Sequence, residues 1–250
     1  MLRGVTTVVI ATRNGHKVEE IRAVLGEGFR VLGAAEVGDV PDVEETGTTF
    51  VENARLKAEA LAAWLRGPRA ANEKGGGRTV DGSWAVLADD SGLEVDALGG
   101  APGVHSARFA SADFGLEGNA PDAANNARLM RLLAAVPWEG RTARFRCVLV
   151  WEWLDDQVQG GSFDGTCEGR IGWVPRGSRG FGYDPLFVPE GGTDTLAELG
   201  EAVKNRISHR ARALERLRAW LGSGCGVPHG ANGGQGGQGN AGAGSPSRSV

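Results

Sequence analysis

Cysteine is scarce in this sequence. The chain has three, Cys147, Cys167 and Cys225, and their spacing matches neither a disulfide framework nor a metal-binding cluster. A few unpaired cysteines are typical of proteins that work in a reducing compartment. We therefore expect a cytoplasmic protein. Cys147 falls in an alternating apolar run, so we interpret it as a small core residue rather than a nucleophile.

An excess of basic charge and a long apolar run are also missing. Lysine and arginine total 27 against 31 acidic residues, a formal net charge of −4, which does not favour binding to duplex nucleic acid or to an anionic membrane. No stretch approaches the roughly 18 apolar residues of a membrane-spanning helix. The first residues enter a strand pattern without the apolar core of a signal peptide.

The composition is that of a globular protein, with 41% hydrophobic and 23% charged residues. Residues 67–83 are rich in glycine and polar residues and show no periodicity, which predicts an inserted surface loop. Residues 222–250 are a glycine-rich stretch without apolar periodicity, which predicts a disordered tail. We expect residues 1–221 to form the functional domain.

Hydrophobic periodicity predicts both strands and helices. β-branched or alternating runs predict strands over residues 5–11, 143–153, 157–166 and 170–174. Helical spacing predicts helices over residues 50–65 and 123–135, and two more that begin after Asn14 and after Ser208. Strands outnumber those of a pure alternating βαβ chain. We therefore expect an α/β fold with a mixed, elongated central sheet flanked by helices, and an active-site cleft between two lobes.

Two adjacent carboxylates, Asp89 and Asp90, follow an apolar run that starts at Trp84. Ser91 and Gly92 come next, and both are common turn residues. We therefore expect the pair at the end of a strand. Carboxylates in such a place suit a hard cation such as Mg²⁺, which takes oxygen ligands and keeps water and phosphate in its shell. From these residues alone, an ordinary solvated turn is an equal alternative.

A polar turn joins the first predicted strand to the first predicted helix. Asn14 is a natural N-cap there, and the free backbone N–H groups at a helix start form an anion site. Lys17 adds a positive charge. The alternative is an ordinary strand-to-helix connection with a solvated lysine.

Three later signals are equally local. Thr49 and Glu52 form a capping box, so a helix begins at Phe50. Phe181 stands between two glycines, where an accessible ring suits stacking on a nucleobase; the alternative is a ring tucked into the core. Ser208 is a natural cap for the last helix.

Five blocks of the sequence together resemble the inosine triphosphate pyrophosphatase family. They are the Thr-x-Asn-x-x-Lys turn at 12–17, Glu-Thr-Gly-x-Thr-Phe-x-Glu-Asn-Ala at 45–54, Ala-Asp-Asp-Ser-Gly-Leu through Ser-Ala-Arg at 88–108, Gly-Phe-Gly-Tyr-Asp-Pro at 180–185, and Lys-x-x-Ile-Ser-His-Arg at 204–210. They follow in the family's order over about Val8 to Leu221, and His105 stands where the family usually has tyrosine.

The resemblance implies hydrolysis of noncanonical purine nucleoside triphosphates (ITP, dITP and XTP) to the monophosphate and pyrophosphate, which removes them from the nucleotide pool before incorporation into DNA or RNA. It implies one or more Mg²⁺ ions per subunit, held by Glu45 and Asp90. Asp90 is the catalytic residue by resemblance, with Asp89 as the less favoured substitute. It also implies a homodimer.

The resemblance further implies a set of substrate-binding residues. They are Thr12, Arg13, Asn14, Gly15, His16, Lys17, Lys57, Ser91, Phe181, Gly182, Tyr183, Asp184, Lys204, His209 and Arg210. Within this set the three lysines would neutralise phosphate charge, and Phe181 would stack on the purine. Arg210, with His209, would donate to the oxygen of a 6-keto base, where adenine presents an amino group instead.

Two other functions compete with this interpretation. A nucleotide-binding module without hydrolysis would fit the same fold, but the carboxylates and lysines that hydrolysis needs are all present. A Maf-type pyrophosphatase for aberrant pyrimidine or modified nucleotides is the second alternative. The Gly-Phe-Gly-Tyr-Asp block and the Ser-His-Arg block argue against it.

Overall fold

The computed structural model describes residues 5–67 and 83–223. The predicted loop at 67–83 and the predicted tail at 222–250 therefore lie outside the described residues, apart from their first or last positions. Within the described ranges, no helix has the length and apolar character needed to cross a lipid bilayer.

A six-stranded sheet forms the centre of the molecule, with the order β2-β1-β3-β4-β5-β6. Its strands are β1 (Thr6–Ile10), β2 (Phe29–Gly33), β3 (Trp84–Val95), β4 (Thr142–Trp153), β5 (Gly161–Ile171) and β6 (Phe187–Pro189). β1 runs parallel to β2 and β3, whereas β3, β4, β5 and β6 pair antiparallel. The predicted α/β fold with a mixed sheet is confirmed.

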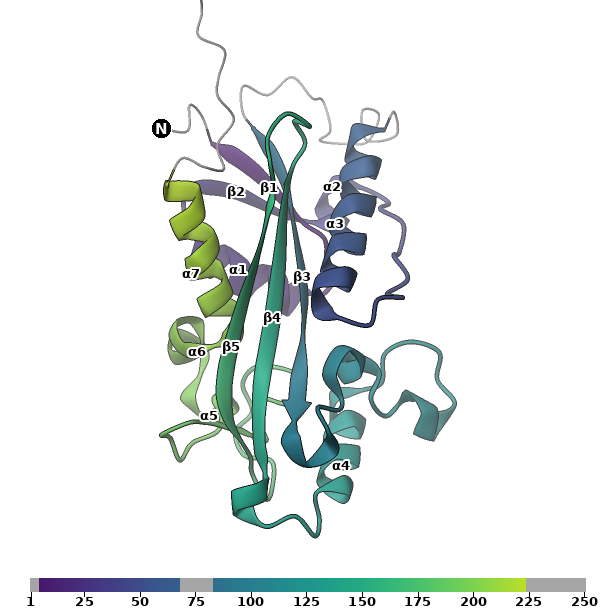
Figure 1. Cartoon of the computed structure of the whole chain (residues 1–250), viewed down its shortest axis with the longest axis vertical. Helices are drawn as coiled ribbons and strands as arrows, with labels where there is room; N and C mark the ends of the chain where they lie inside the picture. The colour runs from purple at the N-terminus through teal and green to yellow at the C-terminus, as the bar shows by residue number, and fades with distance from the viewer. Residues whose placement is uncertain (1–4, 68–82, 224–250) are drawn as a thin grey trace, which may run out of the picture.

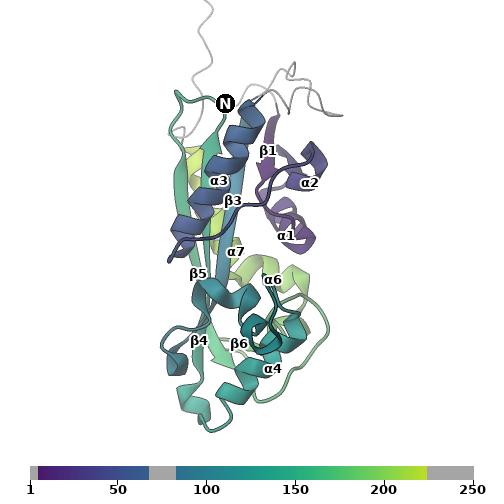
Figure 2. The same cartoon turned by 90° about the vertical axis from the view of Figure 1, so that its right-hand side faces the viewer.

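Seven α-helices surround this sheet in the described residues: α1 (Gly15–Leu25), α2 (Ala34–Val37), α3 (Phe50–Arg66), α4 (Asp122–Leu132), α5 (Leu196–Leu199), α6 (Glu201–Ile207) and α7 (His209–Gly222). Four 3₁₀ turns complete the described chain: η1 (Asp96–Leu98), η2 (Gly103–Arg108), η3 (Ser111–Phe114) and η4 (Trp138–Gly140). In Figure 1 the long strands β3, β4 and β5 run along the length of the molecule, between α7 on one side and α3 on the other. Figure 2 shows β1 and α1–α3 in the upper lobe, and α4 and β6 in the lower lobe.

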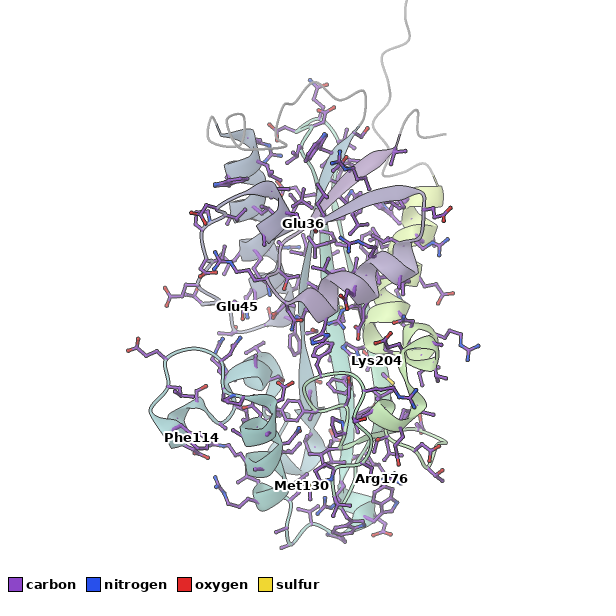
Figure 3. All side chains as sticks on the ribbon, turned by 180° about the vertical axis from the view of Figure 1, so that it is seen from behind. Glu36, Glu45, Phe114, Met130, Arg176 and Lys204 are labelled. Carbon is purple, nitrogen blue, oxygen red and sulfur yellow. The ribbon has the colours of Figure 1, made fainter. Side chains whose placement is uncertain are left out.

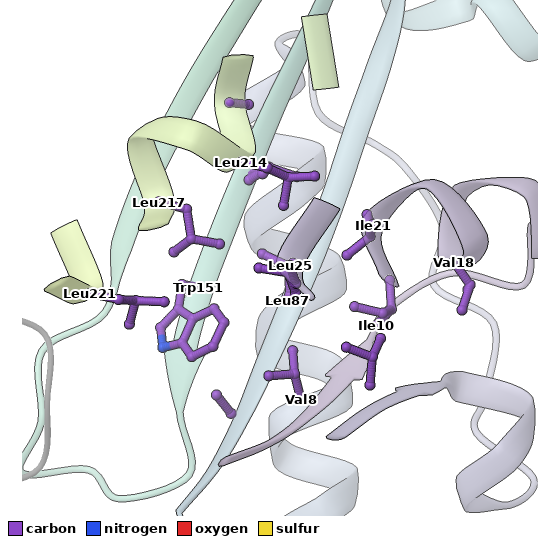
Figure 4. Packing of buried hydrophobic residues seen from close by; sticks show 14 of the residues in the cluster. Val8, Ile10, Val18, Ile21, Leu25, Leu87, Trp151, Leu214, Leu217 and Leu221 are labelled. Atoms are coloured by element: carbon purple, nitrogen blue, oxygen red, sulfur yellow. The ribbon is translucent and has the colours of Figure 1, made fainter. Parts of the chain in front are cut away.

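The two faces of the upper sheet pack against different helices, because successive side chains of a strand point to opposite faces. On one face, Val8, Leu87 and Trp151 pack against α1 and α7, as Figure 4 shows. On the other face, Val86 and Val150 pack against α3. Each fully buried Leu or Val side chain contributes roughly 1.5–3 kcal/mol to folding. Both cores therefore fix the position of β3, the strand that carries the paired carboxylates.

The strand end predicted at Asp89 and Asp90 is wrong, because β3 continues through both residues to Val95. Ser91 and Gly92 pair with β4 instead of turning. A Cβ atom at Gly92 would lie 2.4 Å from the Gly103 carbonyl oxygen. Glycine at this position therefore permits the close approach of η2 to the strand.

The two separate strands predicted at 157–166 and 170–174 are one strand, β5, which spans Gly161–Ile171. Glycines inside it suggested a break. A Cβ atom at Gly165 would lie 2.0 Å from the His209 carbonyl oxygen, and one at Gly169 would lie 2.3 Å from the Val188 carbonyl oxygen. These glycines therefore allow α7 and β6 to pack closely on a continuous strand.

Candidate active site

A cleft of about 460 Å³ opens between the turn before α1, the segment at 40–45, α3 and β3. Its charged and polar lining includes Lys17, Glu45, Lys57, Asp90 and Ser91. Figure 3 places Glu45 at mid-height, where the upper and lower lobes meet. These residues lie far apart in the sequence, and the fold brings all of them to one cleft.

Glu45 and Asp90 converge on one cation. The Nζ atom of Lys57 lies 2.9 Å from Glu45 Oε1 and 2.8 Å from Asp90 Oδ1. Burial raises the pKa of Asp90 above its ordinary value, and the Lys57 charge offsets only part of that rise. Burial also acts to raise the pKa of Glu45, but Lys57, Lys17 and Arg108 outweigh it and lower that pKa. The cleft thus holds two carboxylates around a shared ammonium group.

Asp89 has a different set of neighbours. It accepts hydrogen bonds from Lys17 Nζ at 2.6 Å, Arg210 Nε at 2.8 Å and Ser91 Oγ at 3.0 Å. The Cys147 thiol, at 3.1 Å, donates to the same carboxylate. Burial alone would raise the pKa of Asp89, but Arg210 and Lys17 hold it well below its usual range. Both oxygens of Asp89 are engaged, and its side chain is fully buried.

Sequence reasoning missed Glu20, which joins this network from α1. Its carboxylate bonds Arg210 and also accepts from Lys204 Nζ at 2.8 Å. The charges of Arg210 and Lys204 lower its pKa even though burial opposes that shift. Glu20 lies three positions after Lys17 and hence on the same helix face. This spacing from Lys17 is the sequence feature that could have identified Glu20 as a site residue.

A second cavity, of about 170 Å³, adjoins the cleft and shares Asn14, Lys17 and Ser91 with it. Its remaining lining includes seven residues of the predicted substrate-binding set: Phe181, Gly182, Tyr183, Asp184, Lys204, His209 and Arg210. The two cavities therefore lie side by side, one lined by the Phe181 ring and the other by lysines and carboxylates.

Phe181 has more neighbours than the sequence suggested. Its ring is half-buried and stacks on His16, with 5.5 Å between ring centroids and 12° between planes. Lys204 Nζ lies 4.4 Å from the Phe181 centroid. Asp184 Oδ2 accepts from the Phe181 backbone N–H at 2.9 Å and from Lys204 Nζ at 2.5 Å. His16 comes from the upper lobe, so the ring is held between the two lobes.

His209 is buried at the start of α7 and stacks on Phe145, with centroids 4.8 Å apart. Burial and the Arg210 charge hold the pKa of His209 well below its usual range, so the ring is neutral. Among the described residues, its Nδ1 atom has no hydrogen-bond partner. Tyr183 is also buried, and its hydroxyl donates to the Ser106 carbonyl at 2.9 Å. This hydrogen bond therefore connects the loop that carries Phe181 and Tyr183 to η2.

The remaining predicted residues lie near the turn before α1. Asn14 caps α1 through its side chain, as expected, and accepts from the Lys17 backbone N–H at 3.3 Å. Arg13 lines the cleft but pairs with Asp42 at 2.9 Å. Thr12 also lines the cleft, whereas Gly15 lines neither cavity. Arg13 and Asn14 are thus exposed residues of the predicted substrate-binding set that line the cleft.

The profile of the Ham1 family matches residues 8–220. This chain belongs to the Ham1 family. It is 47% identical to a dITP/XTP pyrophosphatase of Geobacillus kaustophilus over 212 residues, which cover 84% of this chain and 91% of that protein. It is 42% identical to a dITP/XTP pyrophosphatase of Bacillus subtilis over 214 residues, which cover 85% of this chain and 96% of that protein. These relatives match almost their whole length.

Solved structures agree with the family and the fold. The Ham1 protein of Staphylococcus aureus superposes with a TM-score of 0.68 at 37% identity, covering 87% of this chain and 99% of that chain. A HAM1 protein from Coxiella burnetii also gives 0.68, at 38% identity, with 88% and 100% of the two chains covered. The predicted family is confirmed.

Proposed function

We propose that this chain hydrolyses noncanonical purine nucleoside triphosphates, such as ITP, dITP and XTP, to the monophosphate and pyrophosphate. Such an activity would remove these nucleotides before they enter DNA or RNA. One observation supports the proposal most directly. The cleft, lined by lysines and carboxylates, shares lining residues with the second cavity, which is lined by Phe181. The relatives named dITP/XTP pyrophosphatase support the same activity.

The phosphates belong in the cleft. Lys17 and Lys57 supply positive charge there, and Asn14, the N-cap of α1, lines the same space. Hydrolysis at the α-phosphorus builds negative charge on the leaving pyrophosphate. Fixed cations lower the energy of that charge without reorganising during the reaction.

The carboxylates fit a divalent ion, and we propose Mg²⁺, with one or more ions per subunit. Among residues 5–67 and 83–223, no cluster of three or more His, Cys, Asp or Glu side chains forms a complete metal site. Mg²⁺ ordinarily binds through one or two carboxylates and the substrate phosphates. Glu45 and Asp90, both on Lys57 Nζ, match that requirement. When bound, the ion would lower the pKa of a water and neutralise phosphate oxygens.

Asp90 is the proposed proton acceptor for the attacking water. Its carboxylate lines the cleft that would hold the ion and the phosphates, whereas Asp89 does not. Asp89 suits the role less well, because two cations, a hydroxyl and a thiol already donate to it. The choice between the two aspartates, which the sequence left open, thus favours Asp90.

The base belongs in the second cavity. Phe181 would stack on the purine, displacing or extending its present stack on His16. Arg210 donates to Asp89 through Nε and Nη2, to Ser91 through Nη2 and to Glu20 through Nη1. These bonds leave one N–H of Nη1 for a 6-keto oxygen. His209 lines the same wall and is neutral. We also propose that the protein works in the cytoplasm as a homodimer.

A substrate panel tests the proposed function. Pyrophosphate release would be measured for ITP, dITP, XTP, GTP and ATP, each with Mg²⁺ and with a chelator. We expect rapid, Mg²⁺-dependent release from the first three alone. Tight binding of these nucleotides without turnover would identify a binding module instead, and a preference for pyrimidine or methylated nucleotides would favour the Maf-type alternative.

A further inference from the structure

Asn53 is a fully buried polar side chain of α3 that connects two parts of the cleft. Its Oδ1 atom accepts from the backbone N–H of Gly47 at 2.8 Å, and its Nδ2 atom donates to Asp90 Oδ2 at 3.4 Å. One carboxamide therefore contacts both the segment that carries Glu45 and the carboxylate of Asp90. The proposed function above assigns Asn53 no role.

The segment that carries Glu45 depends on such contacts for its position. Residues 39–49 form no helix or strand. The capping box fixes the end of this segment, where Glu52 accepts from the backbone N–H groups of Thr48 and Thr49 at 2.8 and 3.0 Å. The bond from Gly47 to Asn53 fixes the next residue upstream. Glu45 lies only two residues before that anchor.

Gly47 shows how closely the segment approaches the helix. A Cβ atom at this position would lie 2.6 Å from Asn53 Oδ1 and 2.7 Å from Glu52 Cβ. Any larger residue would push the segment away from α3. Gly47 and Asn53 thus form one close contact, and either residue can be replaced without replacing the other.

The amide nitrogen of Asn53 donates a hydrogen bond to Asp90. Lys57 occupies Oδ1 of this carboxylate, and Asn53 donates to Oδ2. With one donor on each oxygen, the carboxylate plane is fixed relative to α3. Because Lys57 also contacts Glu45, the two carboxylates and both donors form a single cluster between α3, the segment that precedes it and β3.

We propose that Asn53 is a positioning residue that holds Glu45 and Asp90 at a fixed separation, so that both can bind the same divalent ion. The inference rests on the proposed function, because the ion belongs to that function. Partners that orient metal ligands typically change metal affinity or activity by about 10–100-fold when they are replaced.

Three variants test the inference. Asn53→Leu removes both hydrogen bonds at similar volume, and Asn53→Asp keeps the acceptor for Gly47 while removing the amide donor to Asp90. Gly47→Ala disrupts the contact between Gly47 and Asn53 while leaving Asn53 itself unchanged. Ala62→Gly is the matched control, because Ala62 is buried on the same helix and makes no polar contact through its side chain. Gly costs roughly 1 kcal/mol in a helix interior.

The first readout is Mn²⁺ binding, followed by electron paramagnetic resonance in the presence of an α,β-methylene analogue of dITP. The second is the Mg²⁺ concentration that gives half-maximal pyrophosphate release from dITP. For Asn53→Leu and Gly47→Ala, we expect Mn²⁺ affinity to fall by about 10-fold or more, and the Mg²⁺ requirement to rise by the same factor. Asn53→Asp should weaken Mn²⁺ binding less than Asn53→Leu does. For Ala62→Gly, we expect the melting temperature to fall. The Mn²⁺ affinity and the Mg²⁺ requirement should both stay at the wild-type values.

The outcomes separate the inference from the proposed function. A wild-type protein that neither binds Mn²⁺ nor releases pyrophosphate would overturn the proposed function. A normal wild type together with a folded Asn53→Leu variant within about twofold in both metal constants would overturn the inference alone. If Asn53→Leu does not fold, Gly47→Ala decides, and unchanged Mn²⁺ affinity in that variant likewise overturns the inference.

Discussion

Asp89 and Asp90 are neighbours on one strand, yet they belong to opposite faces of the sheet. Asp89 meets α1 and α7 through Lys17 and Arg210, whereas Asp90 meets α3 through Lys57 and Asn53. The alternation of side chains along a strand is enough to separate two identical carboxylates. What each one does then depends on the helices that cover its face.

The pKa shifts of the two aspartates have opposite directions. Burial dominates for Asp90 and raises its pKa, since one lysine shared with Glu45 cannot offset it. For Asp89, burial is outweighed by two cations and the pKa falls well below its usual range. The comparison indicates that Asp89 ties the two helices to the sheet, and it supports the proposal that Asp90 is the residue that reacts.

The largest effect is expected for Asp90→Asn. The change removes the proposed metal ligand and proton acceptor while keeping the shape of the side chain, so turnover of dITP should fall by about 10³-fold or more. Lys57 keeps Glu45 as a partner, so the melting temperature should stay close to that of the wild type. Steady-state kinetics and calorimetry on the same sample measure both. A folded variant with near-normal turnover would transfer the role to another residue.

Asp89→Asn should act mainly on stability. Arg210 and Lys17 would each lose a buried charged partner, and breaking a buried ion pair costs about 3–5 kcal/mol. Urea unfolding measures the loss. The control is Asp164→Asn, which breaks an exposed pair with Arg216 and should cost about 0–1 kcal/mol. Equal unfolding free energies for these two variants would contradict a structural role for Asp89.

Arg210→Ala should change base selectivity, since Arg210 links the Asp89 network to the second cavity. A site that hydrogen-bonds a polar group can reject a mismatched analogue by factors up to about 10⁴, so the preference for ITP over ATP should shrink by about 10-fold or more. Arg210→Lys keeps the charge beside Asp89 and serves as the better-folded comparison. If both nucleotides lose kcat/KM in equal proportion, Arg210 is a structural or phosphate-binding residue.

The smallest effect is expected for Phe181→Ala. Stacking on an aromatic ring contributes roughly 1–3 kcal/mol per base and depends little on base identity. The KM values for ITP, dITP and XTP should therefore rise by similar factors, while kcat changes less. His16→Ala, which removes the present partner of the ring, is the companion variant. A change in the ranking of the three substrates would show that Phe181 also selects among bases.

Local signals predicted much of this structure. The capping box at Thr49 and Glu52 and the cap at Ser208 place the starts of α3 and α7 where the sequence put them. The alternation of Cys147, Leu149 and Trp151 placed one face of β4 in the core. These features depend on residues close together in the sequence, so no tertiary information was needed.

Tertiary contacts explain what could not be predicted. Ser91 and Gly92 have turn propensity, but pairing with β4 keeps them in the strand, and η2 requires the glycine for close packing. Glu20 and Asn53 look like ordinary helix residues until α6, α7 and β3 bring their partners to them. The separation of Asp89 from Asp90 likewise needs to be seen in the folded sheet.

The most direct test of this account is the position of the metal. Crystals grown with Mn²⁺ and the α,β-methylene analogue of dITP would locate the ion by its anomalous scattering. The account predicts a peak on the α3 side of β3, within coordination distance of both Glu45 and Asp90, with Asp89 still bonded to Arg210 and Lys17. A peak coordinated by Asp89, or an ion that contacts neither Glu45 nor Asp90, would contradict it.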